Sequence, residues 1–163
     1  MTQPGDELVR VRRDKLDRLR DRGIDPYPHK YTRTHTSAEA SSYLESKETN
    51  ANENVRTEPV RIAGRIMAMR RMGKAIFLDL KDTDGQMQVL FRKNKVPEEF
   101  DLLDDIDIGD WLGVEGPVMR TRTGEPTVEV HGSQILSKSL RSLPEKWHGL
   151  ADVETRYRQR YLD

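Results

Sequence analysis

Alternating apolar and polar residues between positions 60 and 91 constrain the fold of this chain more strongly than any other feature. Val60, Ile62 and Ile66 recur at period two, as expected for a half-buried strand. Two further runs, at 76–81 and 86–91, keep the alternation, and glycine-containing turns at 70–74 and 82–85 separate the runs. The residues expected on the outward face of the first strand are Arg61, Arg65, Met67 and Met69. The pattern predicts three strands joined by tight turns.

A short helix and two more strands are expected after this region. Pro97 to Leu103 has a proline and carboxylates in its first turn, as is typical of a helix start. Strand patterns follow at Trp111–Met119 and Thr127–His131, joined by a loop at 120–125. Three strands, a helix and two strands is the order of an OB-fold, a five-stranded, partly open Greek-key barrel that binds oligonucleotides on strands 2 and 3 and on the loops after strands 1 and 4. Five strands also suit many sandwiches, which periodicity alone leaves open.

Helices are expected in the extension that precedes the barrel, so the predicted class is mainly β with a helical N-terminal extension. Apolar residues at helical spacing alternate with arginines between Leu8 and Leu19, and Gly23 suits a C-terminal cap. Thr36 and Glu39 have capping-box spacing, which predicts a second helix that ends near Lys47. The polar stretch 48–58 is typical of a surface loop or linker.

Composition limits the environment and chemistry of the chain. None of the 163 residues is a cysteine, which excludes disulfides and thiolate zinc sites. No apolar run approaches the roughly 20 residues that span a bilayer, and the first residues lack the features of a signal peptide. We therefore expect a cytoplasmic location and no membrane partner.

Charge is distributed unevenly, although the formal net charge is zero. Residues 61–74 hold five basic and no acidic residues, whereas residues 98–110 hold seven acidic and no basic ones. Such a barrel would orient a polyanion toward the first strand and hairpin, away from the acidic flank. An ordinary mixed surface is the alternative. Asp104, Asp105, Asp107 and Asp110 lack the order of a calcium-binding loop, which favours a solvated acidic connection.

Catalytic motifs are not evident in the sequence. The chain has no glycine-rich phosphate loop, no nucleophile elbow and no histidine paired in sequence with a plausible serine nucleophile. Its four histidines are far apart and lack metal-ligand spacing. We therefore predict no catalytic residue, no metal ligand and no cofactor within this chain, and a binding surface instead.

Several motifs, in the same order, resemble the N-terminal region of class II lysyl-tRNA synthetases. They are RRDKL at 12–16, GIDPYP at 23–28, VRIAGRIM at 60–67 and MGKA at 72–75 with Phe77. The sequences WHGL at 147–150 and ETRYRQRYLD at 154–163 resemble the passage from the anticodon-binding domain into the first catalytic motif of that family. Aspartyl- and asparaginyl-tRNA synthetases share the architecture but match these motifs less well.

The resemblance implies a domain plan and an activity. Residues 1–58 would be a helical extension and linker, 59–143 an anticodon-binding OB-fold, and 144–163 a connector leading into a class II catalytic domain. A full-length enzyme of this family is a homodimer that attaches lysine to tRNA with ATP and Mg²⁺, so residues 1–163 alone are expected to be non-catalytic. The chain would be either a fragment of a longer synthetase or a freestanding homologue, and its end within a motif favours the fragment.

The resemblance also implies contacts with the uridine-rich anticodon loop of a lysine tRNA, tRNA(Lys), at Arg70 or Arg71, Phe77, Gln88 and Glu125. Phe77 would offer a ring for base stacking, unless it packs in a second core beneath the N-terminal helices. Gln88 lies diagonally across the hairpin from Phe77, and ionised Glu125 could accept the imino hydrogen of uridine. Supporting RNA backbone contacts are expected at Arg61, Arg65, Lys74, Arg120 and Arg122. The alternative is a non-catalytic OB-fold module that binds single-stranded nucleic acid or a protein without that selectivity.

Overall fold

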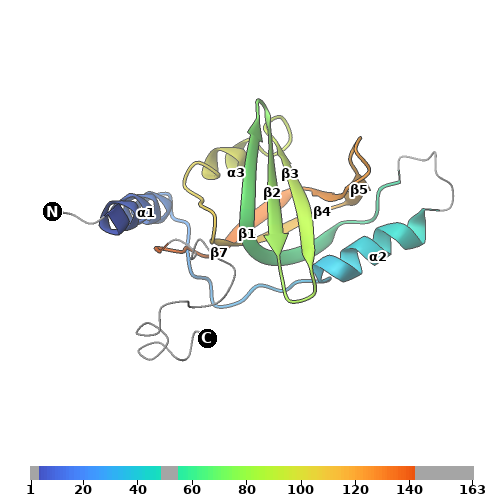
Figure 1. Ribbon diagram of the computed structural model, residues 1–163, viewed down its shortest axis with the longest axis horizontal. Helices are drawn as coiled ribbons and strands as arrows, with labels where there is room; N and C mark the ends of the chain where they lie inside the picture. Colours follow the sequence, from blue (N-terminus) through green and yellow to red (C-terminus); the bar gives the residue numbers. More distant parts are fainter. Residues whose placement is uncertain (1–3, 49–54, 142–163) are drawn as a thin grey trace.

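The computed structural model describes residues 4–48 and 55–141, with side chains from residue 7 onward (Figure 1). Two helices precede the sheet, and a third lies between its third and fourth strands. The elements are α1 (Pro4–Asp21), α2 (Ser37–Lys47), β1 (Val60–Met72), β2 (Ala75–Lys81), β3 (Gln86–Arg92), α3 (Pro97–Leu102), β4 (Trp111–Gly116), β5 (Val118–Arg120), β6 (Pro126–Glu129) and β7 (Gly132–Ser137). The predicted connector 144–163, with its motifs, lies outside the described residues.

The strands form one open sheet in the order β5-β6-β3-β2-β1-β4-β7. All pairs are antiparallel except β3 with β6, which is parallel. This arrangement confirms the mainly β class and the OB-fold, with the helix after the third strand. The sheet has seven strands rather than five, because the predicted fourth strand is split and residues 132–137 add a strand beside β4.

The split between β4 and β5 has a local cause. Pro117 has no backbone N–H to donate, so it interrupts the ladder between the two strands. The chain before it pairs with β1 and the chain after it pairs with β6. A Cβ at Gly116 would lie 1.9 Å from the carbonyl oxygen of Glu129, so only glycine allows this close approach. One continuous segment therefore links the two halves of the curled sheet.

An irregularity in β1 changes which side chains face outward. Even-numbered residues up to Ile66 lie in the core, but the register with β2 shifts between Ile66 and Ala68. An extra residue in one strand reverses the alternation beyond it. Met69 therefore lies opposite Leu78 and packs against the core. The prediction that Met69 faces outward is wrong for this reason.

One hydrophobic core fills the interior of the sheet and extends to the helices. The alternating residues of the first three strands are buried as the sequence predicts, and Leu19 of α1 and Leu44 of α2 join them. The fully buried large side chains are Phe91, Leu19, Leu44, Ile62, Ile66, Ile76, Leu78, Leu80, Met87, Leu90, Leu103 and Leu112.

Both predicted helix ends are confirmed. Gly23 follows α1 with a φ of 73°, which favours glycine, and α2 begins with the capping box of Thr36 and Glu39. The start of α2 is also tied to the turn between β2 and β3, since Ser37 donates through N and Oγ to the Asp82 carboxylate, both at 2.7 Å. Burial would raise the pKa of Asp82, but these bonds and those from the turn backbone lower it. Helix α2 is therefore fixed against the sheet (Figure 1).

Three of the four aspartates before β4, namely Asp105, Asp107 and Asp110, are not solvated, contrary to the prediction, whereas the side chain of Asp104 is exposed. The carboxylate of Asp110 is fully buried, and Asp105 is 6% exposed. Lys138 Nζ, also fully buried, lies 2.8 Å from Asp110 and 2.6 Å from Asp107. Burial would raise the pKa of Asp107, but its bonds to Lys138 and Lys15 lower it. The segment is therefore an internal ion-pair network.

Helix α1 docks on this network through its basic face. Lys15 lies 2.5 Å from Asp107, and Arg18 lies 2.7 Å from Asp105. Arg12 adds three hydrogen bonds to the carbonyl oxygens of Ile108, Ser139 and Arg141. We call this contact between α1 and residues 105–110 and 138 the α1 docking site. Asp105 and Asp107 of the acidic flank therefore form ion pairs with cations of α1.

Candidate nucleic-acid interface

Strand register aligns a row of side chains across the outer face of the sheet. Arg70 of β1 lies opposite Phe77 of β2, Phe77 opposite Leu90 of β3, and Leu90 opposite Glu129 of β6. Paired residues point to the same side of a sheet, so these four side chains form one continuous strip. We call the surface of β1, β2, β3 and β6 that carries this row, together with the loop 120–125, the outer face.

Phe77 lies on the outer face as predicted. It is half-buried, while its neighbours Ile76 and Leu78 are buried in the core. The described core cluster does not include Phe77. A ring that is supported from below but still partly accessible can act as a platform for an unstacked base.

The register shift in β1 separates the two hairpin arginines. Arg70 lies opposite Phe77 on the outer face, whereas Arg71 lies opposite the core residue Ile76. The Arg71 guanidinium donates to the carbonyl oxygen of Leu103 at 2.9 Å, beside α3. The geometry therefore brings Arg70, and not Arg71, together with Phe77.

Arg70 is held in place by a carboxylate that the sequence did not single out. Its two terminal nitrogens donate to the two oxygens of Asp79, at 3.1 and 3.4 Å. The Arg70 side chain remains half-exposed, while Asp79 is nearly buried. Since a bidentate pair fixes the plane of the guanidinium, Asp79 orients Arg70 over the outer face.

Gln88 and Glu125 are joined directly. The Gln88 amide Nε2 donates to Glu125 Oε2 at 3.2 Å, and Gln88 Oε1 accepts from Thr127 Oγ1 at 2.9 Å. Glu125 is exposed, and its second oxygen accepts no hydrogen bond from the described residues. The structure thus places the predicted amide and carboxylate side by side, diagonal to Phe77.

Gln88 itself is only 8% exposed, although a contact with the anticodon was predicted for its amide. The reason is that β6 pairs with β3 on the side away from β2, which brings Thr127 directly opposite Gln88. Both polar groups of the amide already have partners, so its main geometric effect is to orient Glu125. Thr127 could not be singled out from sequence because the parallel pairing of β3 with β6 joins segments 39 residues apart.

The expected supporting cations divide into two groups. Arg61 lies 5.0 Å from the Tyr31 ring and Arg65 lies 5.5 Å from the Trp111 ring, next to β4. These two arginines are half-buried and pack against those rings, away from Phe77. Lys74 is exposed in the turn between β1 and β2.

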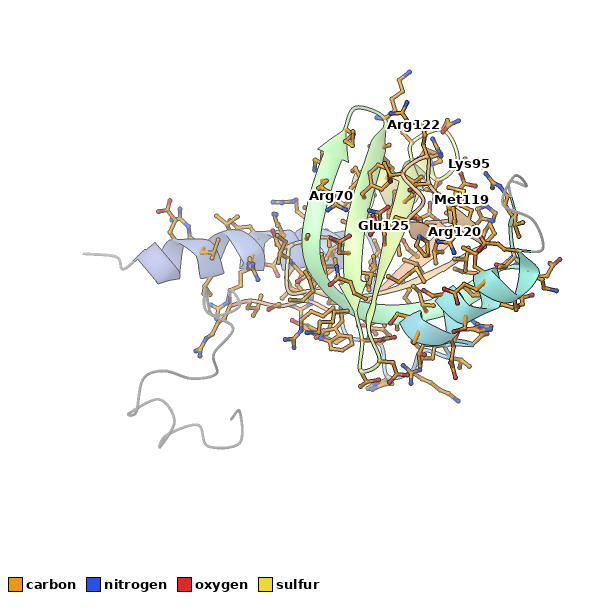
Figure 2. All side chains as sticks on the ribbon, turned by 45° about the vertical axis from the view of Figure 1, so that its right-hand side comes forward. Arg70, Lys95, Met119, Arg120, Arg122 and Glu125 are labelled. Carbon is orange, nitrogen blue, oxygen red and sulfur yellow. The ribbon has the colours of Figure 1, made fainter. Side chains whose placement is uncertain are left out.

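The loop 120–125 carries the other expected cations. Arg120 pairs with Glu48 at 2.6 and 2.9 Å and donates to the Gly124 carbonyl oxygen, so it shapes the loop that bears Glu125. Arg122 is exposed near the tip of that loop. Figure 2 shows Arg70 toward the β1 side of this surface and Arg120 and Arg122 toward the far side, with Glu125 between them.

A charged cluster at the β6 end of the outer face was not predicted. The carboxylate of Glu129 is 2% exposed and pairs with Arg56, Arg92 and Lys95. Burial would raise the pKa of Glu129, but the bonds to Lys95 and Arg56 outweigh it and lower the pKa to about 2. Alternation along β6 could have placed Glu129 outward, but not its three partners, which come from other segments.

Residues 4–48 and 55–141 contain neither a metal-binding cluster nor a membrane-spanning helix. Within these ranges, no group of three or more histidine, aspartate or glutamate side chains is arranged to hold a metal ion. No helix in the same ranges is both long and apolar enough to cross a membrane.

Comparison with known proteins places this geometry in a family context. Residues 60–136 match a family described as an OB-fold nucleic acid binding domain. The chain is 52% identical to a lysine–tRNA ligase of Dehalococcoides mccartyi over 98% of its own length, which is 32% of that protein. Lysine–tRNA ligases of Pelotomaculum thermopropionicum and Lactococcus lactis are 52% and 46% identical over 96% of the chain, covering 30% and 32% of those proteins. The chain thus spans about a third of the length of these curated relatives.

Proposed function

Because this chain is homologous to the N-terminal third of lysine–tRNA ligases and residues 60–136 form an OB-fold nucleic acid binding domain, we propose that its outer face reads the anticodon of a lysine tRNA. The observation that carries the proposal is the hydrogen bond between Gln88 and Glu125 beside the Phe77 ring. It combines a stacking platform with an oriented acceptor on one surface.

Base selection follows from the chemistry of Glu125. Uridine presents an imino N–H that the free oxygen of the carboxylate can accept, while Gln88 holds the other oxygen. Cytosine presents an acceptor at the same ring position, so the carboxylate would face a lone pair without a hydrogen. An unmet hydrogen-bonding group costs about 1–3 kcal/mol, which corresponds to a preference of roughly 5- to 150-fold for uridine.

Variants separate stacking from base identity. Phe77→Ala should weaken the binding of every anticodon stem-loop by about 1–3 kcal/mol, because stacking tolerates any base. Gln88→Ala and Glu125→Ala should instead narrow the gap between stem-loops with a central uridine and a central cytosine. Gln86→Ala is the matched control, since Gln86 is exposed on the same strand. Equal losses for both RNAs in the Gln88 and Glu125 variants would favour an unselective OB-fold module.

We further infer that the whole protein is an ATP-dependent lysine–tRNA ligase that acts as a homodimer in the cytoplasm. Its division into residues 1–58, 59–143 and 144–163 follows the same inference. ATP, Mg²⁺ and lysine would bind in a part of the protein outside residues 1–163. Residues 1–163 alone should then show no lysine-dependent exchange of pyrophosphate into ATP, and turnover above a buffer blank would contradict this division.

A further inference from the structure

Three cations converge on one buried carboxylate at the β6 end of the outer face. Arg92 Nε donates to Glu129 Oε1 at 3.0 Å, and Lys95 Nζ donates to Oε2 at 2.8 Å. Arg56 donates to the same Oε2. Three positive charges and one negative charge leave a net charge of +2 in this cluster. We call Arg56, Arg92 and Lys95, held by Glu129, the β6 cation cluster.

The exposure of these side chains distinguishes the cluster from an internal ion pair. The side chains of Arg56, Arg92 and Lys95 are 49%, 44% and 40% exposed, whereas the carboxylate of Glu129 is 2% exposed. The buried carboxylate therefore anchors the cations from beneath while nearly half of each cationic side chain stays exposed. Since the cations come from the segment before β1, the end of β3 and the turn before α3, their convergence is a product of the tertiary fold.

The position of the cluster relates it to the base-reading residues. The row of paired residues runs from Arg70 through Phe77 and Leu90 to Glu129. Three strand spacings of about 4.8 Å make this row about 14 Å long. Nucleotides stacked at about 3.4 Å would place roughly four along that length. A short single strand that stacks on Phe77 thus has room between the cations at the two ends of the row. Figure 2 shows Arg70 and Lys95 on opposite sides of Glu125.

We propose that the β6 cation cluster binds a backbone phosphate of the RNA strand whose bases are read beside Phe77. This inference rests on the proposed function. Guanidinium and ammonium groups suit phosphate oxygens, and a net charge of +2 suits a polyanion. Glu129 acts as a positioning residue, because it holds the donors in place without touching the RNA. A phosphate contact strengthens binding without selecting a base.

Salt dependence tests this assignment. Arg92→Gln and Lys95→Gln are compared with Lys93→Gln, a matched control whose side chain lies in the same turn but pairs with Asp101. The probe is a uridine-centred anticodon stem-loop, titrated from 0.05 to 0.5 M salt, with thermal unfolding of each variant measured in parallel. The loss of one single-strand phosphate contact should reduce the slope of log affinity against log salt concentration by about 0.7. A variant that binds as tightly as wild type at about 1 M salt should then bind about five-fold more weakly than wild type at about 0.1 M salt. The control should keep the wild-type slope.

The outcomes separate this inference from the proposed function. The phosphate site is supported if Arg92→Gln and Lys95→Gln reduce the slope of the salt dependence and weaken the binding of uridine- and cytosine-centred stem-loops equally. If both keep the slope of Lys93→Gln while Phe77→Ala still weakens binding, the cluster is structural only and the anticodon proposal survives. If either variant changes the uridine preference, the contact is to a base and the phosphate assignment is wrong. If the wild-type protein fails to bind the stem-loop at all, the proposed function itself fails.

Discussion

The α1 docking site and the outer face both combine carboxylates with cations, but they leave those charges in different states. In the α1 docking site, Lys138 and Asp110 are both fully buried and form an ion pair with each other. On the outer face, Glu129 is buried while its three cations stay 40–49% exposed. Lys138 is therefore enclosed together with its carboxylate, whereas the cations around Glu129 keep a large part of their side chains at the surface. Cations kept at the surface remain available to an external polyanion.

The comparison also corrects an argument from charge alone. The acidic flank was expected to orient a polyanion toward the first strand, with Asp104, Asp105, Asp107 and Asp110 solvated. Instead, Asp105, Asp107 and Asp110 pair with Lys15, Arg18 and Lys138. The flank therefore organises the N-terminal helix. Charge counts along a sequence record neither which charges pair nor which stay exposed.

The largest expected effect concerns stability in the α1 docking site. Asp110→Asn removes the fully buried carboxylate that pairs with the fully buried Lys138, and breaking such a buried pair costs about 3–5 kcal/mol. Urea unfolding should show this loss. Asp104→Asn is the control, since its side chain is 73% exposed and its pair with Arg71 is worth at most about 1 kcal/mol. If Asp110→Asn were as stable as Asp104→Asn, the enclosed network would not hold the fold together.

The second effect is a dependence of stability on pH that arises at the outer face. The folded-state pKa of Glu129 is about 2, below its ordinary value of 4.5, because Lys95 and Arg56 outweigh the effect of burial. A lowered pKa stabilises the fold above pH 4.5, and this contribution is lost as the pH falls from 4.5 toward 2. It amounts to at most about 3 kcal/mol.

Glu129→Gln isolates that carboxylate from the other acids of the chain. Unfolding free energies of wild type and Glu129→Gln are compared between pH 2 and pH 6. The difference between them should shrink as the pH falls through this window. A difference that stayed constant with pH would show that Glu129 is not ionised in contact with its cations.

The smallest expected effect distinguishes the two hairpin arginines. Arg70→Ala removes an exposed cation from the outer face, and should weaken stem-loop binding about five-fold at 0.1 M salt. Arg71→Ala removes a side chain that is bonded to Leu103 and Asp104, and should leave RNA binding unchanged. The reverse pattern would mean that the register shift in β1 does not decide which arginine meets RNA.

Much of the fold is predictable from sequence because its determinants are local. The alternation from Val60 to Phe91, the capping box at Thr36 and the cap at Gly23 each act within a few residues. The split at Pro117 differs from the prediction of one strand over 111–119, although a proline in a strand is itself a local signal. Local rules thus predicted the OB-fold and the order of its elements up to residue 131, but neither the split of the fourth strand nor β7.

The candidate site was only partly predictable, because its geometry depends on pairing between distant segments. The predicted set of Phe77, Gln88 and Glu125 does come together, with Arg70 on the same face. Sequence did not reveal that Gln88 would be buried, since that depends on the parallel pairing of β3 with β6. The partners of Glu129 were hidden for the same reason.

The most direct test of the central claim is a map of RNA contacts on the protein. A uridine-centred anticodon stem-loop would be titrated into ¹⁵N-labelled protein, and changes in backbone amide chemical shifts would be followed by NMR. The account predicts that the largest changes lie on the outer face, around Phe77, Gln88 and Glu125, and that residues 105–110 change little. Changes concentrated at residues 105–110, with the outer face unaffected, would contradict it.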